Sequence, residues 1–427
     1  MGRYQLLVAV MCGLIVSIDG FDAQAMGYVA PALTAALHIP RSVLGSVISS
    51  GLVGMMIGAL MSGPIADRVG RKPVLVVSAL TFGIGSLFTA TAHSVEALTT
   101  FRVLTGLGMG GAMPNAIALT SEYMPRRRRA AAVTSMICGF SLGAALGGFV
   151  AASLIPRFGW ESVFIVGGGL PILIAAAGFL LLPESIRFLL VKGGEDERAR
   201  RYLARMAPGA VLPRDLSPGL DEQPSGAGAF LVKQLFTEGR AATTALIWVV
   251  YSMNLLNLYF LTSWLPTIIS DAGTPVRTAI LLTALFQVGG IGGTIVLGRV
   301  LDRYFSFWIL AACYLWAAVS VLLIGRLSAS IPVLAFTIAS AGLGIIGGQN
   351  LSHALTADVY PTRMRSTGVG WALGIGRIGS IVGPILGGLL LVRGTAIRQV
   401  FWAAAIPALI ATAAAASVTF FRRGDPR

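Results

Sequence analysis

Long apolar runs, each close to the twenty or so residues with which an α-helix crosses a bilayer, constrain this chain more than any other feature. Hydrophobic residues make up 55% of the 427 residues and charged residues only 12%, a balance that excludes a soluble protein of this size. We therefore predict an all-α integral membrane protein with twelve transmembrane helices. The predicted spans are approximately 6–28, 44–64, 74–92, 96–118, 130–153, 161–182, 242–264, 278–299, 307–325, 331–356, 367–391 and 397–420.

The basic residues lie mostly on one side of these spans. With a cytoplasmic N-terminus, 24 of the 32 Lys and Arg residues face the cytoplasm, six lie outside and two lie within spans. Because positive charge accumulates in cytoplasmic loops, this bias predicts a multi-pass protein of the inner (plasma) membrane with both termini in the cytoplasm. The bias also accounts for the net charge of +14, so no nucleic-acid partner is expected.

The chain repeats itself at an offset of 235 or 236 residues. Gly63-Pro-Ile-Ala-Asp-Arg68, for example, matches Gly298-Arg-Val-Leu-Asp-Arg303. Internal repeats of this kind are typical of transporters built from two related bundles. We predict two pseudo-symmetric six-helix halves, residues 1–183 and 241–427, joined by a cytoplasmic linker at 184–240.

Two carboxylates, Asp19 and Asp22, interrupt the first apolar run. A charge at the centre of a bilayer costs about 2.5–3.5 kcal/mol on insertion scales, so an acid at this depth suggests a function. Residues three apart share a helix face, and both side chains are expected to point into the protein interior. Burial and mutual repulsion favour a proton on one member, which makes the pair a candidate for proton coupling. A fixed ion pair with a nearby arginine is the alternative.

The repeat places two asparagines opposite these acids. At the offset of 235, Asn254 corresponds to Asp19 and Asn257 to Asp22. The second half therefore keeps the polar pattern without the charge. The asparagines could face a central substrate cavity, or they could hydrogen-bond neighbouring helices and serve packing alone.

Only two basic residues, Arg102 and Arg377, lie within spans. Arg102 lies about as far from the outer end of its span as Asp22 does, so the two can pair. Arg377 lies in the middle of its span, with no acid of its own half at that depth. An intramembrane guanidinium of this kind favours an anionic substrate, although a structural arginine bonded to carbonyls is the alternative.

Further polar and aromatic residues are candidates for contact with a substrate. Gln349 and His353 lie four residues apart in the tenth span and share a face, and His353 could carry a proton or could be a satisfied polar residue. Tyr251 and Trp371 offer ring surfaces for stacking, although membrane aromatics more often serve packing.

The loop from Gly63 to Lys72 resembles the signature loop between the second and third spans of the major facilitator superfamily. In that family the loop is thought to latch the two halves together on the cytoplasmic side. The second copy of this loop, in the other half, keeps Asp302 and Arg303 but lacks the Gly-Arg-Lys ending. The resemblance implies latch roles for six charged residues: Asp67, Arg68, Arg71, Glu122, Asp302 and Arg303.

A more specific similarity is to the aromatic acid:proton symporter branch of the same superfamily. It rests on Asp19-Gly-Phe-Asp22, on Arg102 with the glycine-rich segment 106–115, and on 370–377. Glu161 departs from the pattern, where a basic residue is expected. The resemblance implies proton-coupled import of a benzoate-like carboxylate by a monomer that needs no cofactor beyond the coupling H+.

Two other functions remain open from the sequence. An efflux antiporter for cationic compounds would need an acid without matching arginines, which Arg377 disfavours. A non-transporting membrane sensor would not need titratable groups in mid-membrane. The chain has no nucleotide-binding domain and no nucleophile–base pair, so neither ATP-driven transport nor enzymatic activity is expected.

Overall fold

The computed structural model describes residues 2–192, 196–206, 234–237, 239–304, 306–326, 330–361, 364–392 and 395–422. Within these ranges the chain forms helices joined by short turns and contains no strand. The predicted all-α class is therefore confirmed.

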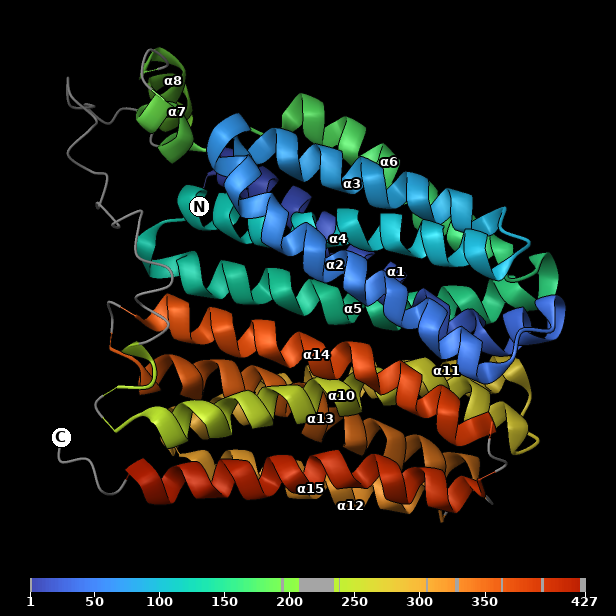
Figure 1. The fold of residues 1–427 in the computed structure, drawn as a ribbon. Coiled ribbons are helices and arrows are strands. Elements are labelled where there is room, and N and C mark those ends of the chain that lie inside the picture. Colours follow the sequence, from blue (N-terminus) through green and yellow to red (C-terminus); the bar gives the residue numbers. More distant parts are fainter. Residues whose placement is uncertain are drawn as a thin grey trace. The chain divides into compact units, whose positions relative to one another are not determined.

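Twelve long helices correspond to the twelve predicted spans in the described part of the chain. Those of the first half are α1 (Arg3–Leu37), α2 (Arg41–Val69), α3 (Arg71–Ala90), α4 (Val95–Tyr123), α5 (Arg126–Phe158) and α6 (Glu161–Leu181). Those of the second half are α10 (Ala241–Asp271), α11 (Val276–Arg303), α12 (Phe307–Ile324), α13 (Ile331–Val359), α14 (Arg365–Val392) and α15 (Ile397–Arg422). Figure 1 shows them as long rods.

The predicted linker contains two short helices, α7 (Ile186–Lys192) and α8 (Asp196–Met206). The sequence allows a surface helix in the first part of the linker, at 185–206, and both short helices lie there. Residues 207–233 of the linker lie outside the described residues.

Eleven of the described helices are long and apolar enough to cross a membrane by length and composition. The exception among the twelve is α4, which is 29 residues long and carries Arg102. Ser94 caps its N-terminus by accepting a hydrogen bond from the backbone N–H of Ala97 at 3.2 Å. The helix that falls short in hydropathy is thus the one that carries a buried cation.

The described contacts divide the chain into two compact units. The first comprises residues 1–23, 53–144 and 161–225. In it, α3 packs on both α4 and α6 (Figure 1). Small residues form the contact between α1 and α5, where a Cβ at Gly20 would overlap the carbonyl of Phe140. Membrane helices approach this closely because glycine leaves the backbone surface bare.

The second unit comprises residues 24–52, 145–160 and 226–427. In it, α10 packs on α14 and α15, and α13 packs on α11 and α12. Two segments of the first half, 24–52 and 145–160, group with this unit because they pack directly on its helices.

Two interactions illustrate how residues 24–52 pack within the second unit. The Ser49 hydroxyl donates to the Ile381 carbonyl at 2.6 Å, and Arg41 pairs with Asp271 at 2.8 Å. By the predicted orientation, these contacts lie toward the extracellular ends of α2, α10 and α14. A division at the linker is predicted from sequence, and the structural units differ from it through these two segments.

We predict opposite effects on stability for alanine at two glycines of the first half. A Cβ at Gly143 would overlap the backbone of Ser17 on α1, whereas at Gly169 on α6 nothing lies within 4 Å. Gly143→Ala should therefore destabilise by about 1–3 kcal/mol, because neither backbone can retreat. Gly169→Ala should be neutral or stabilising by up to about 1 kcal/mol, through helix propensity.

Thermal unfolding midpoints of the two purified variants in detergent measure this difference. Equal midpoints would show that the α1–α5 contact tolerates a methyl group and is looser than described.

Candidate functional site

The centre of the first unit holds a buried ion pair. Arg102 Nη2 lies 3.2 Å from Asp22 Oδ2, with 4% of Arg102 and 1% of Asp22 exposed. α1 supplies the acid and α4 the base, as their equal predicted depths suggest. The expected pairing of Asp22 with Arg102 is confirmed.

Further contacts from α3, α4 and α6 complete this cluster. Ser86 on α3 donates to Asp22 Oδ1 at 2.8 Å, and Arg102 Nη2 donates to the Thr105 hydroxyl at 3.0 Å. The guanidinium carbon also lies 5.0 Å from the centre of the Phe164 ring on α6, a cation–π contact. Four helices thus converge on one charge pair. Arg102 Nε has no hydrogen-bond partner among the described residues, so the guanidinium is not saturated.

Asp19 lies one helical turn before Asp22 and is fully buried, at 0% exposure. It shares its side of α1 with Val8 and Ile15, which belong to the apolar core of the first unit. Both acids point into the protein interior, as predicted. The acid of the pair that contacts Arg102 is Asp22, whereas Asp19 has other interactions.

The two asparagines of the second unit are also buried. Asn254 is 3% exposed and Asn257 is 1% exposed. They lie on the side of α10 that carries Val250, a member of the apolar core of the second unit. The carboxamide of Asn257 has no hydrogen-bond partner among the described residues, so it does not bond a neighbouring helix. A substrate role for the two asparagines stays a prediction.

Arg377 lies on the side of α14 that continues toward α2. Ile381, one turn further along, accepts the hydrogen bond from Ser49, and Pro384 lies where a Cβ at Gly45 would fall. Helical periodicity therefore aims Arg377 toward the first-half segments. Arg377 is not without a partner in the structure, so it is not the bare cation that the sequence suggests.

The remaining predicted site residues fall into two groups. Tyr251 on α10 and His353 on α13 bond to each other, with 2.9 Å between the Tyr251 hydroxyl and His353 Nδ1. Gln349 lies one turn from His353 on the same side of α13. Trp371, by contrast, stacks on Trp248 with 6.0 Å between ring centres and is 42% exposed. It lies on another side of α14 than Arg377, and its substrate role stays a prediction.

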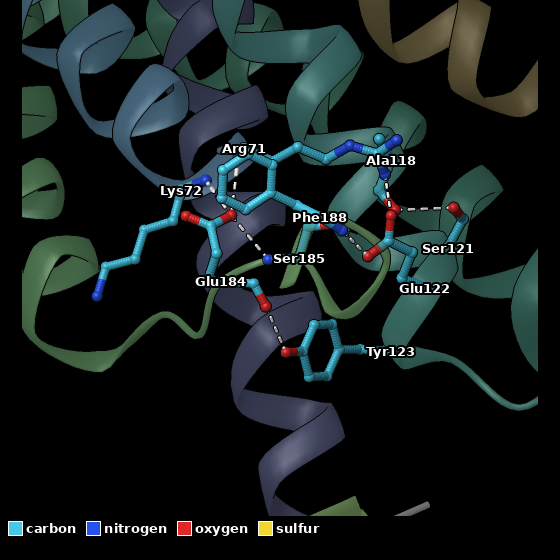
Figure 2. Close-up of polar contacts among 9 residues, drawn as sticks. All are labelled: Arg71, Lys72, Ala118, Ser121, Glu122, Tyr123, Glu184, Ser185 and Phe188. Atoms are coloured by element: carbon cyan, nitrogen blue, oxygen red, sulfur yellow. Dashed lines mark hydrogen bonds and ion pairs between the residues drawn. The ribbon is translucent and has the colours of Figure 1, made fainter. Parts of the chain in front are cut away.

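The start of α3, the end of α4 and the segment before α7, all predicted to face the cytoplasm, carry a second polar cluster (Figure 2). Arg71 pairs with Glu122, and the Ser185 hydroxyl donates to Glu122 Oε2 at 2.7 Å. Both Arg71 and Glu122 are predicted latch residues, and the structure brings them together. Asp67 and Arg68 are exposed at the end of α2, and the side chain of Asp302 lies outside the described residues. The latch roles stay predictions.

Glu184 is a residue of this cluster that the sequence analysis missed. Its Oε1 accepts from the backbone N–H groups of Arg71 at 2.8 Å and Lys72 at 3.1 Å, at the start of α3 (Figure 2). The Tyr123 hydroxyl donates to its backbone carbonyl at 2.6 Å. A carboxylate at a helix N-terminus satisfies orphan N–H groups and opposes the helix dipole. Its only signal in the sequence is an acid directly after Pro183, at the start of the linker.

The site geometry defines a class of protein: a helical membrane protein with an ion pair and a further acid sealed in its first unit. A sequence profile described as the Major Facilitator Superfamily matches residues 12–307 and 247–427. The chain belongs to this superfamily, whose members are transporters and not enzymes.

Curated relatives make the placement more specific. The chain is 45% identical over 412 residues to the 4-hydroxybenzoate transporter PcaK of Pseudomonas aeruginosa, covering 96% of this chain and 92% of that protein. It is 38% identical to a gallate transporter of Pseudomonas putida, covering 96% and 91% of the two chains. It is 34% identical to a benzoate transport protein of Acinetobacter baylyi, covering 98% and 90%. The resemblance to the aromatic acid branch is confirmed.

Solved structures support the fold. An inward-facing, unoccupied bacterial homolog of the human lysosomal transporter Spinster superposes with a TM-score of 0.78 at 17% identity, covering 100% of this chain and 99% of that one. The xylose transporter XylE of E. coli superposes with a TM-score of 0.72 at 15% identity, covering 99% and 98%. The predicted major facilitator fold is confirmed.

We predict that breaking the buried pair destabilises the protein more than breaking an exposed one. Arg102→Ala leaves Asp22 buried without its cation and should cost about 3–5 kcal/mol. Arg41→Ala is the matched control, because the side chains of its pair with Asp271 are 32% and 35% exposed, and it should cost about 0–1 kcal/mol. Adding Asp22→Asn to Arg102→Ala should restore part of the loss. Unfolding midpoints of the purified variants test this order, and equal losses for the two arginines would contradict it.

Proposed function

We propose that this protein imports an aromatic carboxylate together with protons, by alternating access across the inner membrane. The observation that carries the proposal is the Asp22–Arg102 pair, buried in the first unit with Asp19 one turn away. A single proton on the carboxylate would change the net charge of this buried pair from zero to +1. A sensor that does not transport has no need of such a group.

The substrate class rests on the relatives. Their names specify 4-hydroxybenzoate, gallate and benzoate, and each of these is an aromatic ring with a carboxylate. Arg377 supports an anionic substrate because its guanidinium can grip a carboxylate through two parallel hydrogen bonds. Its helix side, shared with Ile381 and Pro384, aims it toward the first-half segments. An antiporter for cations would gain nothing from this arginine.

Coupling follows from one charge balance. While Asp22 is ionised, its negative charge balances the positive charge of Arg102, and the pair has no net charge. A proton on the carboxylate weakens the pair and leaves Arg102 with an excess positive charge in a low-dielectric interior. A bound anion restores neutrality, so proton and carboxylate favour each other's occupancy. Asp19, buried beside the pair, is the second group that can hold a proton.

The other components of the proposal follow from this scheme. The bilayer and the carboxylate are the partners, and the coupling ion is H+, with no cofactor. The monomer holds both charge sites and is the transporting unit. Asp67 and Arg71, with Glu122, steady the cytoplasmic ends while the outward-open state forms, and Asp302 and Arg303 do so in the second half.

Proteoliposome uptake under a pH gradient tests proton coupling. The parent protein should concentrate 4-hydroxybenzoate when the outside is acidic, and Asp22→Asn should abolish this accumulation. Glu96→Gln, which changes an exposed acid at the start of α4, is the control and should transport normally. Exchange of labelled for unlabelled substrate without a gradient separates uncoupling from misfolding. If the double variant Asp19→Asn, Asp22→Asn still concentrates substrate under a pH difference, these acids do not carry the proton.

Calorimetry with benzoate-type ligands tests the anion site. Arg377→Ala should lose binding, and Arg377→Lys should recover little of it because an ammonium lacks the planar fork. Arg398→Ala, at an exposed arginine near the start of α15, serves as the charge-matched control and should bind normally. Undiminished affinity in Arg377→Ala would move the carboxylate site elsewhere.

A further inference from the structure

A tyrosine–histidine pair joins α10 to α13 in the second unit. The Tyr251 hydroxyl is 2.9 Å from His353 Nδ1, and the two ring centres are 5.4 Å apart. This hydrogen bond joins α10 to α13 and fixes the orientation of the imidazole.

Tyr251 also packs against α14 at Gly376, the residue that precedes Arg377. A Cβ at Gly376 would lie 3.1 Å from the Cβ of Tyr251 and 2.9 Å from Leu255 Cδ1. α14 thus contacts α10 at the residue that precedes Arg377. Arg377 on α14, Tyr251 on α10 and His353 on α13 therefore lie on three helices that contact one another within the second unit.

The His353 ring has a second nitrogen that can form a further hydrogen bond. Among the described residues its hydrogen bond is made through Nδ1, and a neutral imidazole presents a second nitrogen, Nε2, as donor or acceptor. His353 is half-buried, and Gln349 lies one turn away on the same side of α13. A ring hydroxyl can donate to or accept from Nε2 in either tautomer.

A neighbouring tyrosine contact on α13 shows a different arrangement. Tyr314 and Ser352 hydrogen-bond at 2.8 Å, and both are fully packed, at 1% and 2% exposure. Ser352 also donates to the Gly348 carbonyl. That contact is complete within the protein and joins α12 to α13. The Tyr251–His353 pair differs because its histidine is only half-buried and keeps a second nitrogen.

We propose that His353 reads the ring hydroxyl of a hydroxylated aromatic carboxylate through Nε2, with Tyr251 as the positioning residue that orients the imidazole. This inference rests on the proposed function and adds a residue that determines specificity within it. Arg377 binds the carboxylate common to all such substrates, and His353 separates hydroxylated rings from plain ones. A site built to bond a hydroxyl discriminates against the analogue that lacks it, because its own polar group is then left unpaired.

Binding of two ligands that differ only in the hydroxyl tests the proposal. Affinities of the purified protein for 4-hydroxybenzoate and benzoate are measured by calorimetry for the parent, His353→Leu, His353→Gln and Tyr251→Phe. His353→Leu should weaken 4-hydroxybenzoate by about five- to tenfold and leave benzoate within about twofold. His353→Gln, which keeps a donor and an acceptor, should recover part of the loss. Tyr251→Phe should give a smaller loss with the same selectivity.

Tyr314→Phe is the matched control, since it removes a hydroxyl bonded to α13 at a fully packed contact. It should leave the ratio of the two affinities unchanged. A loss of equal size for both ligands in His353→Leu would assign the pair a purely structural role and overturn the inference. An unchanged affinity for 4-hydroxybenzoate would overturn it as well.

The outcomes separate this inference from the function on which it rests. A parent protein that binds neither ligand contradicts the proposed function. A parent that binds both, with a ratio that no variant at 251 or 353 alters, contradicts only the role of His353.

Discussion

A charge buried at bilayer depth is the constraint on which the rest of the first unit depends. Asp22 of α1 and Arg102 of α4 can be buried at low cost only as a pair, because either one alone would be an uncompensated charge in a low-dielectric interior. Their pairing requires Asp22 and Arg102 to lie at one depth, with α3 and α6 close enough to supply Ser86 and Phe164. The positions of four helices are therefore tied to a single interaction. α4, which is the least able of the twelve long helices to cross a membrane by composition, carries half of that interaction.

Close approach of helices is the second requirement, and glycine meets it. α1 contacts α5 at Gly20 and Gly143, and α10 contacts α14 at Gly376 and Gly379, in each case where a side chain would overlap a neighbour. Lipid tails do not drive apolar helices together as water does, so this complementarity of backbone surfaces supplies the packing energy. The same contact at Gly376 places Tyr251 against the residue that precedes Arg377. Packing thus determines where the polar groups of the second unit can meet.

Much of this architecture could be predicted from the sequence, because hydropathy and sidedness follow directly from the bilayer. The spans, the repeat and the pairing of Asp22 with Arg102 all depend on depth along a helix, and depth can be counted in residues. Contacts between helices distant in sequence depend on rotation and tilt, which periodicity leaves open. The bonds of Glu184 to the start of α3, the Tyr251–His353 pair and the grouping of residues 24–52 with the second unit are of this kind. Trp371 shows the same limit, since its stacking on Trp248 is set by helix rotation.

The repeat also shows how two halves of one origin come to differ. The offset that sets Asn257 opposite Asp22 sets Thr337 opposite Arg102, and both replacements are neutral and buried. The Thr337 hydroxyl donates to the Val333 carbonyl of its own helix at 2.7 Å, so it needs no hydrogen-bond partner on α10. Losing the acid and the base together avoids a lone buried charge, which is the costly intermediate. Among the described residues, α10 and α13 therefore lack the electrostatic link that Asp22 and Arg102 provide between α1 and α4. The packing of these two helices depends on the fit of their surfaces and not on a buried pair of charges.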